Sequence, residues 1–218
     1  MALQPLHQSK NRLADSAHAA IMAALREGSL KPGDRLVMDR IAAELGISRT
    51  PVRDALQRLE REGVIVASPP RGYEVRTVSA DEIRAIYQAR EAVEGYAARV
   101  VAGLGAEAVA EVEQAMDAAA ELDVSTVHGA FAANVAVHRG IVSAAGNSYL
   151  VDLFDDVWGR VAAVLSFAEL YFQEIEHPDV RADHAKLVRA LRSGDAAKAE
   201  RAAINHIRDG LQRNLPAG

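Results

Sequence analysis

The sequence predicts a mostly α-helical protein in which a winged helix-turn-helix is followed by an all-α helical bundle. Alanine, the strongest helix former, supplies 43 of the 218 residues, while aromatic residues make up only 5%. Residues 1–78 carry 12 Lys and Arg against 9 Asp and Glu, whereas residues 79–218 carry 13 against 21. This asymmetry indicates two domains with different partners. We expect a flexible tail at 1–10, a first domain at 11–78 and a second at 79–218.

The composition excludes several classes of protein. Half of the residues are hydrophobic and a quarter are charged, which is typical of a globular chain and not of a disordered one. The sequence has no cysteine, so disulfide frameworks, thiolate metal sites and cysteine nucleophiles are ruled out. The N-terminus has no apolar signal segment, and no apolar run approaches the roughly 18 residues of a membrane span. We therefore expect a cytoplasmic protein with no membrane partner.

The first domain is expected to contain three helices and a hairpin. Apolar residues recur at helical spacing, and Gly28 and Gly63 follow as helix stops. The predicted helices span residues 12–27, 39–45 and 50–62. Two strands that flank the turn residues Pro69-Pro70-Arg71-Gly72 are predicted at 64–66 and 73–75. Three helices followed by such a hairpin form a winged helix-turn-helix.

Residues 42–52 have the spacing of a helix-turn-helix. Small Ala42 lets the two helices cross closely, and Gly46 can adopt the left-handed conformation of the turn. Val52 packs the second helix back onto the first. The second helix of this pair is therefore the one expected to face DNA.

The start of that second helix is suited to nucleic acid. Pro51 lies in the first turn, where its missing N–H costs nothing, and Ser48 or Thr50 can cap that end. Arg49 and Arg53 are four residues apart and so project from one face. A helix N-terminus with two arginines suits phosphates and guanine edges. The alternative is a solvated charged face, but the turn, the proline and the charges together favour DNA contact.

The run LGISRTPVRDALQRLEREGVI, followed by PPRGYEV, resembles the DNA-binding domain of the GntR family of bacterial transcription regulators. The family often has a basic DNA-contacting residue at the position of Asp39, and neighbouring Arg40 is a candidate to replace it. The resemblance implies that the following residues contact a double-stranded DNA operator: Ser48, Arg49, Thr50, Arg53, Arg71 and Gly72.

The second domain is expected to be a bundle of six helices. Ser79 and Glu82 form a capping-box pattern that opens its first helix. No strand pattern follows, and glycines or helix-starting residues separate the periodic segments. The predicted helices span residues 80–102, 106–122, 125–145, 148–174, 178–193 and 195–214.

Three histidines lie on the apolar faces of three predicted helices: His138, His184 and His206. A buried imidazole without a partner is costly, so each forms its own hydrogen bond or the three share a ligand. For any one alone, a hydrogen-bonded core histidine is the simpler interpretation. Their convergence, with the side-chain oxygen of Asn134 one turn before His138, favours a divalent metal such as zinc or nickel.

The second domain is also similar to the FCD-type effector domain of the FadR branch of the GntR family. Its pattern is Asp-x-x-x-His followed by two further histidines on later helices. Asn134, His138, His184 and His206 fall on those positions, with Asn134 in place of the usual aspartate. The resemblance implies a metal-binding, effector-binding and dimerising domain. The count of six helices resembles the VanR-type subgroup.

Arg90 shares a helix face with apolar residues and therefore points inward. An inward arginine must be paired. Its partner is either a protein carboxylate such as Glu94 or the carboxylate of a bound metabolite, which the guanidinium fork matches in geometry.

These features predict a ligand-responsive transcription regulator that binds a palindromic operator as a homodimer. The bundle is expected to sense a small carboxylic acid with the help of the metal. One alternative is a metal-dependent hydrolase or lyase built on the bundle, and another is an architectural DNA-binding protein whose second domain only dimerises. The expected metal ligands have no obvious general base beside them, so we expect no enzymatic activity.

Overall fold

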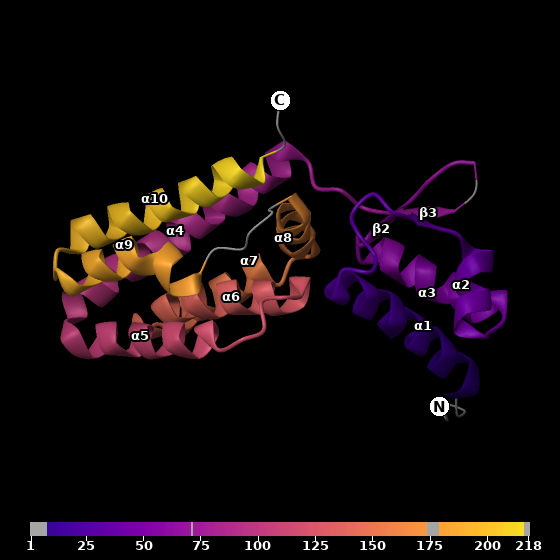
Figure 1. Ribbon diagram of the computed structural model, residues 1–218, viewed down its shortest axis with the longest axis horizontal. Coiled ribbons are helices and arrows are strands. Elements are labelled where there is room, and N and C mark those ends of the chain that lie inside the picture. The colour runs from indigo at the N-terminus through magenta and orange to yellow at the C-terminus, as the bar shows by residue number, and fades with distance from the viewer. Residues whose placement is uncertain (1–7, 71, 174–178, 216–218) are drawn as a thin grey trace, which may run out of the picture. The chain divides into compact units, whose positions relative to one another are not determined.

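The computed structural model describes residues 8–70, 72–173 and 179–215. Within them it contains ten helices and one small sheet, which confirms the predicted mostly α-helical class (Figure 1). The chain divides into two compact units, residues 1–77 and 78–218, so that Val78 belongs to the second unit. Among the described helices, none is long and apolar enough to cross a membrane.

The first unit contains three helices and three short strands: α1 (Gln8–Glu27), β1 (Arg35–Leu36), α2 (Met38–Leu45), α3 (Arg49–Arg61), β2 (Ile65–Ala67) and β3 (Tyr73–Val75). Helix α1 begins at Gln8, so residues 8–10, predicted to belong to the tail, are helical. The remainder of the predicted tail, residues 1–7, lies outside the described residues. Gly46 ends α2 with φ +63°, the left-handed conformation expected for the turn.

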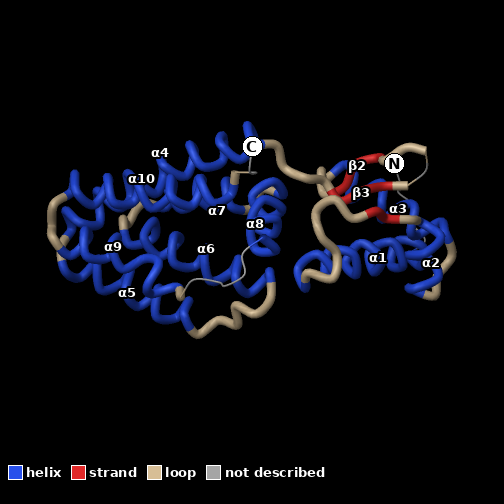
Figure 2. Tube along the Cα trace, turned by 45° about the horizontal axis from the view of Figure 1, so that its top comes forward, coloured by secondary structure: helices blue, strands red, loops and turns tan. Residues whose placement is uncertain are grey.

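The strands of the first unit form an antiparallel sheet in the order β1, β3, β2. Figure 2 shows β2 and β3 side by side in this sheet. The hairpin β2–β3 was predicted, but β1 was not, since two residues are too few to display an alternating pattern. Leu36 of β1 pairs with Tyr73 of β3. Gly72 has φ +125°, and a Cβ there would lie 3.1 Å from the carbonyl oxygen of Leu36. The wing therefore requires glycine at this position.

Helix α3 is held by its apolar face. Val52, Leu56 and Leu59 are fully buried, and α3 packs against α1, whose Ala17 and Ile21 are also buried. The opposite face of α3 is left exposed, as the sequence pattern predicts for a helix that presents charged residues outward.

The second unit contains seven described helices: α4 (Ala80–Leu104), α5 (Ala106–Ala120), α6 (Val127–Ala144), α7 (Ser148–Trp158), α8 (Val161–Gln173), α9 (Val180–Arg192) and α10 (Ala196–Asn214). The predicted count of six is wrong, so the number of helices does not support the resemblance to the VanR-type subgroup. The expected helix 148–174 is interrupted at Gly159 and Arg160. Glycine is about 1 kcal/mol less favourable than alanine inside a helix, so little helix stability is lost when the helix is interrupted at this position.

Side chains cap most of these helices at their N-termini. Ser79 Oγ accepts a hydrogen bond from the Glu82 N–H at 3.2 Å, which confirms the capping residue predicted for α4. The same arrangement opens α6, α7, α9 and α10, where the capping residues are Thr126, Asn147, Asp179 and Asp195. These caps satisfy backbone N–H groups that have no partner within the helix.

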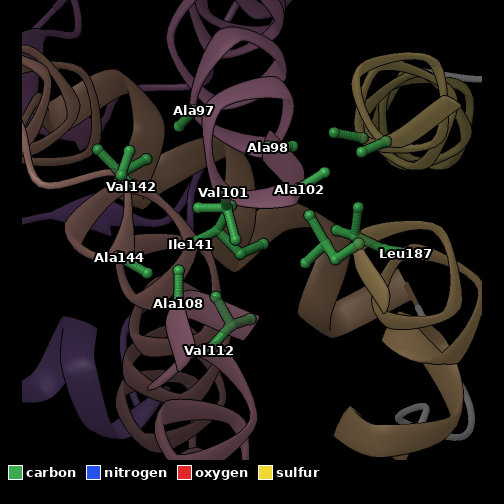
Figure 3. Close-up of a cluster of buried hydrophobic side chains, with 14 of the residues drawn as sticks. Ala97, Ala98, Val101, Ala102, Ala108, Val112, Ile141, Val142, Ala144 and Leu187 are labelled. Carbon is green, nitrogen blue, oxygen red and sulfur yellow. The ribbon is translucent and has the colours of Figure 1, made fainter. Parts of the chain in front are cut away.

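The core of the second unit consists largely of alanine and valine. Side chains of α4, α5, α6 and α9 gather in it, as Figure 3 shows. Small residues let the helices approach closely: a Cβ at Gly95 of α4 would lie 3.0 Å from Ile204 of α10, which runs along it (Figures 1 and 2). Helices α4, α6, α7, α9 and α10 surround the three predicted histidines.

Candidate functional site

The structure brings together the three histidines that the sequence placed on separate helices. His138 of α6 and His184 of α9 are buried, and His206 of α10 is half-buried. Their ring centroids lie 4.5 to 5.2 Å apart, and one nitrogen from each ring lies within 4.8 Å of the others. The cluster therefore has the size of a single-ion site.

The ring nitrogens of two of these histidines are oriented for a shared ligand. His184 Nδ1 lies 2.8 Å from the carbonyl oxygen of Val180, and His138 Nδ1 lies 2.7 Å from Glu94 Oε2. Each ring therefore turns Nε2 toward the other, at 3.3 Å. Two nitrogens bound tetrahedrally to one zinc ion, each at about 2.0–2.1 Å, lie about 3.3–3.4 Å apart. The spacing fits the proposed ion.

Burial keeps two of the histidines neutral. Desolvation lowers the pKa of His184 to about 4, and the repulsion that would arise between two protonated rings, His138 and His184, adds to it. Desolvation lowers the pKa of His206 to about 2, and repulsion from Arg90 and from a protonated His138 or His184 would add to it. Both imidazoles are therefore unprotonated at neutral pH, as metal ligands must be.

Arg90 is buried beside the histidines and is paired with Glu94. Its Nε donates to Glu94 Oε1 at 2.9 Å, so the protein carboxylate predicted as one alternative is present. Its Nη2 lies 3.4 Å from His138 Nε2, and its guanidinium carbon lies 4.3 Å from the centre of the Trp158 ring. Arg90 thus reaches the side of the cluster where His138 Nε2 faces His184, while it remains tied to Glu94.

Glu94 is ionised in this environment. Burial alone raises the pKa of Glu94, but the charge of Arg90 and the contact with His138 outweigh it and hold the pKa below its ordinary value. Trp158 Nε1 also donates to Oε1 at 3.1 Å. The sequence pointed to Glu94 only as a partner of Arg90, and its contact with His138, 44 residues away in the chain, carries no sequence signal.

A cavity of about 110 Å³ opens onto this cluster. Arg90, Asn134, His138 and His206 line it, whereas His184 is not part of its wall. Asn134 is half-buried and faces the same cavity as the histidines, consistent with its place on the helix face predicted from the sequence. The apolar part of the wall includes Trp158, Phe167, Leu170 and Ile207.

Further polar residues of the cavity wall were not identified from the sequence. Arg213 and Asn214 lie two turns beyond His206 on α10. Arg213 is paired with Asp183 at 3.5 Å, and Asn214 Nδ2 donates to Tyr87 Oη at 3.3 Å. The sequence pattern could have identified both residues, because they lie three and four residues after Gly210 and so continue the helix face that carries His206.

The expected DNA-contacting residues lie at the start of α3 and at the wing. Thr50 and Arg53 are exposed, and Pro51 is buried in the first helical turn. Ser48 occupies the N-cap position, but its side chain makes no capping hydrogen bond. Gly72 is half-buried in the wing, and Arg71 lies outside the described residues.

Arg49 is exposed but forms an ion pair with Asp39 of α2, the residue that stands where the family often has a basic one. Arg40, the candidate replacement, donates to Glu44 at 2.7 Å within the same helix. Both arginines are therefore paired with a carboxylate in the structure, and both pairs are solvent-exposed.

Comparisons with known proteins match both units. Residues 13–75 match the model of bacterial regulatory proteins of the gntR family, and residues 85–209 match the FCD domain. A probable D-xylose utilization operon transcriptional repressor of Paenarthrobacter nicotinovorans is 28% identical over 200 residues, which cover 91% of this chain and 87% of that protein. The HTH-type transcriptional regulator McbR of Escherichia coli (strain K12) is 25% identical over 193 residues, 86% of this chain and 84% of McbR.

A solved structure agrees with this assignment. A putative transcriptional regulator GntR from Rhodococcus sp. RHA1 has a TM-score of 0.66 at 25% identity, and the match covers 94% of this chain and 98% of that one. The matched families and relatives are transcription regulators, so the alternative of a hydrolase or lyase is not supported. The chain belongs to the GntR family of bacterial regulatory proteins, in its FadR-like branch, and carries an FCD domain after the DNA-binding domain.

Proposed function

We propose that this regulator is a ligand-responsive homodimer that binds a palindromic operator in the bacterial cytoplasm. Helix α3 reads the DNA, with Ser48, Arg49, Thr50 and Arg53 at its start and Arg71 and Gly72 in the wing. The second unit dimerises and binds a divalent metal and a small carboxylate effector. Binding of the effector changes the affinity for the operator.

The observation that carries the metal proposal is the convergence of three imidazoles, two of which turn their Nε2 atoms toward each other at 3.3 Å. His138, His184, His206 and Asn134 would hold zinc or nickel, for which the three imidazoles are suitable ligands. When bound, the ion supplies a fixed positive charge for an anionic ligand. The charges of Arg90 and Glu94 cancel, and the four proposed ligands are neutral, so the protein does not compensate the charge of the ion.

The effector proposal follows from this charge and from the cavity wall. Arg90 Nε is occupied by Glu94, but its Nη2 lies beside the histidine cluster. A guanidinium N–H in this position suits a carboxylate that also approaches the ion. The apolar wall at Trp158 and Phe167 favours a small acid with a short apolar part.

Metal content tests the proposal. We expect about one zinc or nickel ion per chain in the purified protein, and almost none in a His184→Ala variant that keeps its helical circular dichroism. The matched control is His128→Ala, because His128 is an exposed residue of α6, the helix that also carries His138. Full metal content in folded His184→Ala would refute the site. With metal bound, small carboxylates are then screened for a change in operator affinity.

A further inference from the structure

We infer that Glu94 is a positioning residue for the metal centre: it fixes the orientation and the tautomer of His138. The inference rests on the proposed metal site and names a part of it that coordinates nothing itself. The supporting observation is that the two oxygens of the buried Glu94 carboxylate contact different partners.

The first oxygen, Oε1, holds the carboxylate in place. It accepts hydrogen bonds from Arg90 Nε at 2.9 Å and from Trp158 Nε1 at 3.1 Å. Arg90 is on the same helix as Glu94, whereas Trp158 ends α7. Two donors from different helices leave the carboxylate little freedom to rotate.

The second oxygen, Oε2, faces His138. It lies 2.7 Å from His138 Nδ1, and it is the one buried side-chain oxygen of the described chain that has no aligned hydrogen bond. An ionised carboxylate has no proton to donate, so Oε2 can only act as a hydrogen-bond acceptor, and the neighbouring atom must carry the proton. The arrangement therefore favours the His138 ring that carries its proton on Nδ1.

The tautomer decides which nitrogen can bind an ion. A neutral imidazole with its proton on Nδ1 has its lone pair on Nε2. His138 Nε2 is the atom that faces His184 Nε2 at 3.3 Å. A carboxylate behind a ligating histidine fixes the ring orientation and strengthens the ligand. In His184 the carbonyl oxygen of Val180 occupies the corresponding position, at 2.8 Å from Nδ1.

A purely structural role for Glu94 makes a different prediction. A buried ion pair such as Arg90–Glu94 costs desolvation and is weak evidence for a stabilising role. If Glu94 served only to neutralise Arg90 or to join α4 to α7, the protonation site of His138 would not depend on it. The tautomer therefore separates the two roles.

The experiment uses the full chain. Histidine labelled with ¹⁵N is observed by NMR in metal-free protein at pH 8, and the signals of Nδ1 and Nε2 of His138 report which nitrogen carries the proton. We expect His138 to carry its proton on Nδ1 in the unmodified chain and to become a mixture of tautomers in Glu94→Gln. Zinc affinity, measured by competition with a chromogenic chelator, should fall about 10- to 100-fold in Glu94→Gln.

Two further variants sharpen the test. Glu113→Gln removes a carboxylate of α5 that pairs with Arg192 at the surface, and it should leave the tautomer and zinc affinity unchanged. Trp158→Phe keeps an aromatic ring but removes one donor to Oε1, so its zinc affinity should fall less than that of Glu94→Gln.

Each outcome decides the inference. An unchanged tautomer and unchanged zinc affinity in folded Glu94→Gln would overturn it. If Glu94→Gln does not fold, the spectrum of the unmodified chain decides, because a proton on His138 Nε2 contradicts the inference directly. If the unmodified chain binds no zinc, the proposed metal site fails, while the tautomer measurement still shows whether Glu94 controls His138.

Discussion

Arg49 and Arg53 share one face of α3 but differ in their surroundings. Arg49 is paired with Asp39, whereas Arg53 is exposed at the start of the same helix. An exposed ion pair contributes at most about 1 kcal/mol, so the Asp39 pair orients Arg49 without locking it. Arg53 is therefore the residue whose removal should report base recognition most directly.

We expect Arg53→Ala to lose operator discrimination, because a bidentate contact between arginine and guanine contributes about 1–3 kcal/mol. Competition between operator and scrambled DNA, at a fixed salt concentration, measures this loss. Arg61→Ala is the control, since Arg61 is an exposed residue of the last turn of α3. Equal discrimination by Arg53→Ala and Arg61→Ala would remove Arg53 from the recognition surface.

The buried histidines make the stability of the metal-free protein depend on pH. His184 and His206 have folded-state pKa values of about 4 and about 2, below the ordinary 6.5 of the unfolded chain. Between pH 6.5 and pH 5 the unfolded state binds more protons than the folded state, so stability falls as the pH falls. Each histidine contributes at most about 1.4 kcal/mol per pH unit.

Urea denaturation with a chelator present, at several pH values between 7.5 and 5, measures this slope. We expect a shallower slope in His206→Gln, which has one titrating group fewer in this range. A slope equal to that of the unmodified chain would mean that His206 is not held neutral by the fold. The range ends at pH 5 because ordinary carboxylates begin to titrate below it.

At the scale of helices and strands, most boundaries follow from local chemistry that the sequence displays. The caps at Ser79 and Asp195 and the glycine at 46 act on neighbouring backbone, so they can be identified without the fold. Strand β1 could not be identified, since it exists only through pairing with β3. Gly159 itself is a sequence signal for the interruption between α7 and α8. The apolar pattern continues on both sides of it, however, so one continuous helix was expected.

The candidate site also has a part that the sequence predicts and a part that only the structure shows. The three histidines could be predicted because each is anomalous on an apolar helix face, and the pair Arg90 and Glu94 because the two are four residues apart on one helix. The contact between Glu94 and His138 depends on how α4 and α6 are rotated against each other. Periodicity gives the face of a helix but not its register against a neighbour, so that contact required the structure.

Helices α5 and α6 approach each other through small residues, and this approach can be tested. A Cβ at Gly140 of α6 would lie 2.5 Å from the Cβ of Ala115 of α5. Gly140→Ala gains up to about 1 kcal/mol of helix propensity, but overpacking costs about 1–3 kcal/mol. We therefore expect a net loss of stability of up to about 2 kcal/mol by urea denaturation.

The control for Gly140→Ala is Gly103→Ala. Gly103 lies near the end of α4, where an added Cβ would meet nothing within 4 Å, so this variant should be neutral or slightly more stable. The double variant Gly140→Ala with Ala115→Gly should recover most of the loss. If Gly140→Ala is as stable as Gly103→Ala, the close approach of α5 and α6 is not a constraint.

At the scale of the whole molecule, the proposed homodimer determines what kind of DNA site the protein can bind. Two recognition helices related by a twofold axis require two half-sites in fixed helical phase. We expect two chains per operator, and a strong loss of affinity when about five base pairs, half a helical turn, are inserted between the half-sites. Fluorescence anisotropy with native and expanded operators measures this, and undiminished binding to the expanded site would contradict the dimer.

At the proposed metal site, Asn134 stands at the position of the aspartate in the family pattern, and we expect this difference to affect the response of the whole regulator. Three neutral imidazoles and one carboxylate around a divalent ion leave a charge of about +1, whereas Asn134 leaves about +2. The more positive site should hold its ion less firmly alone and gain more from an anionic effector. By linkage, the ion then raises effector affinity by the same factor as the effector raises ion affinity. We expect this coupling factor to be larger in the unmodified chain than in Asn134→Asp. Zinc titrations with and without a saturating carboxylate measure it in both proteins, and an equal or larger factor in Asn134→Asp would show that the charge of residue 134 does not set the coupling.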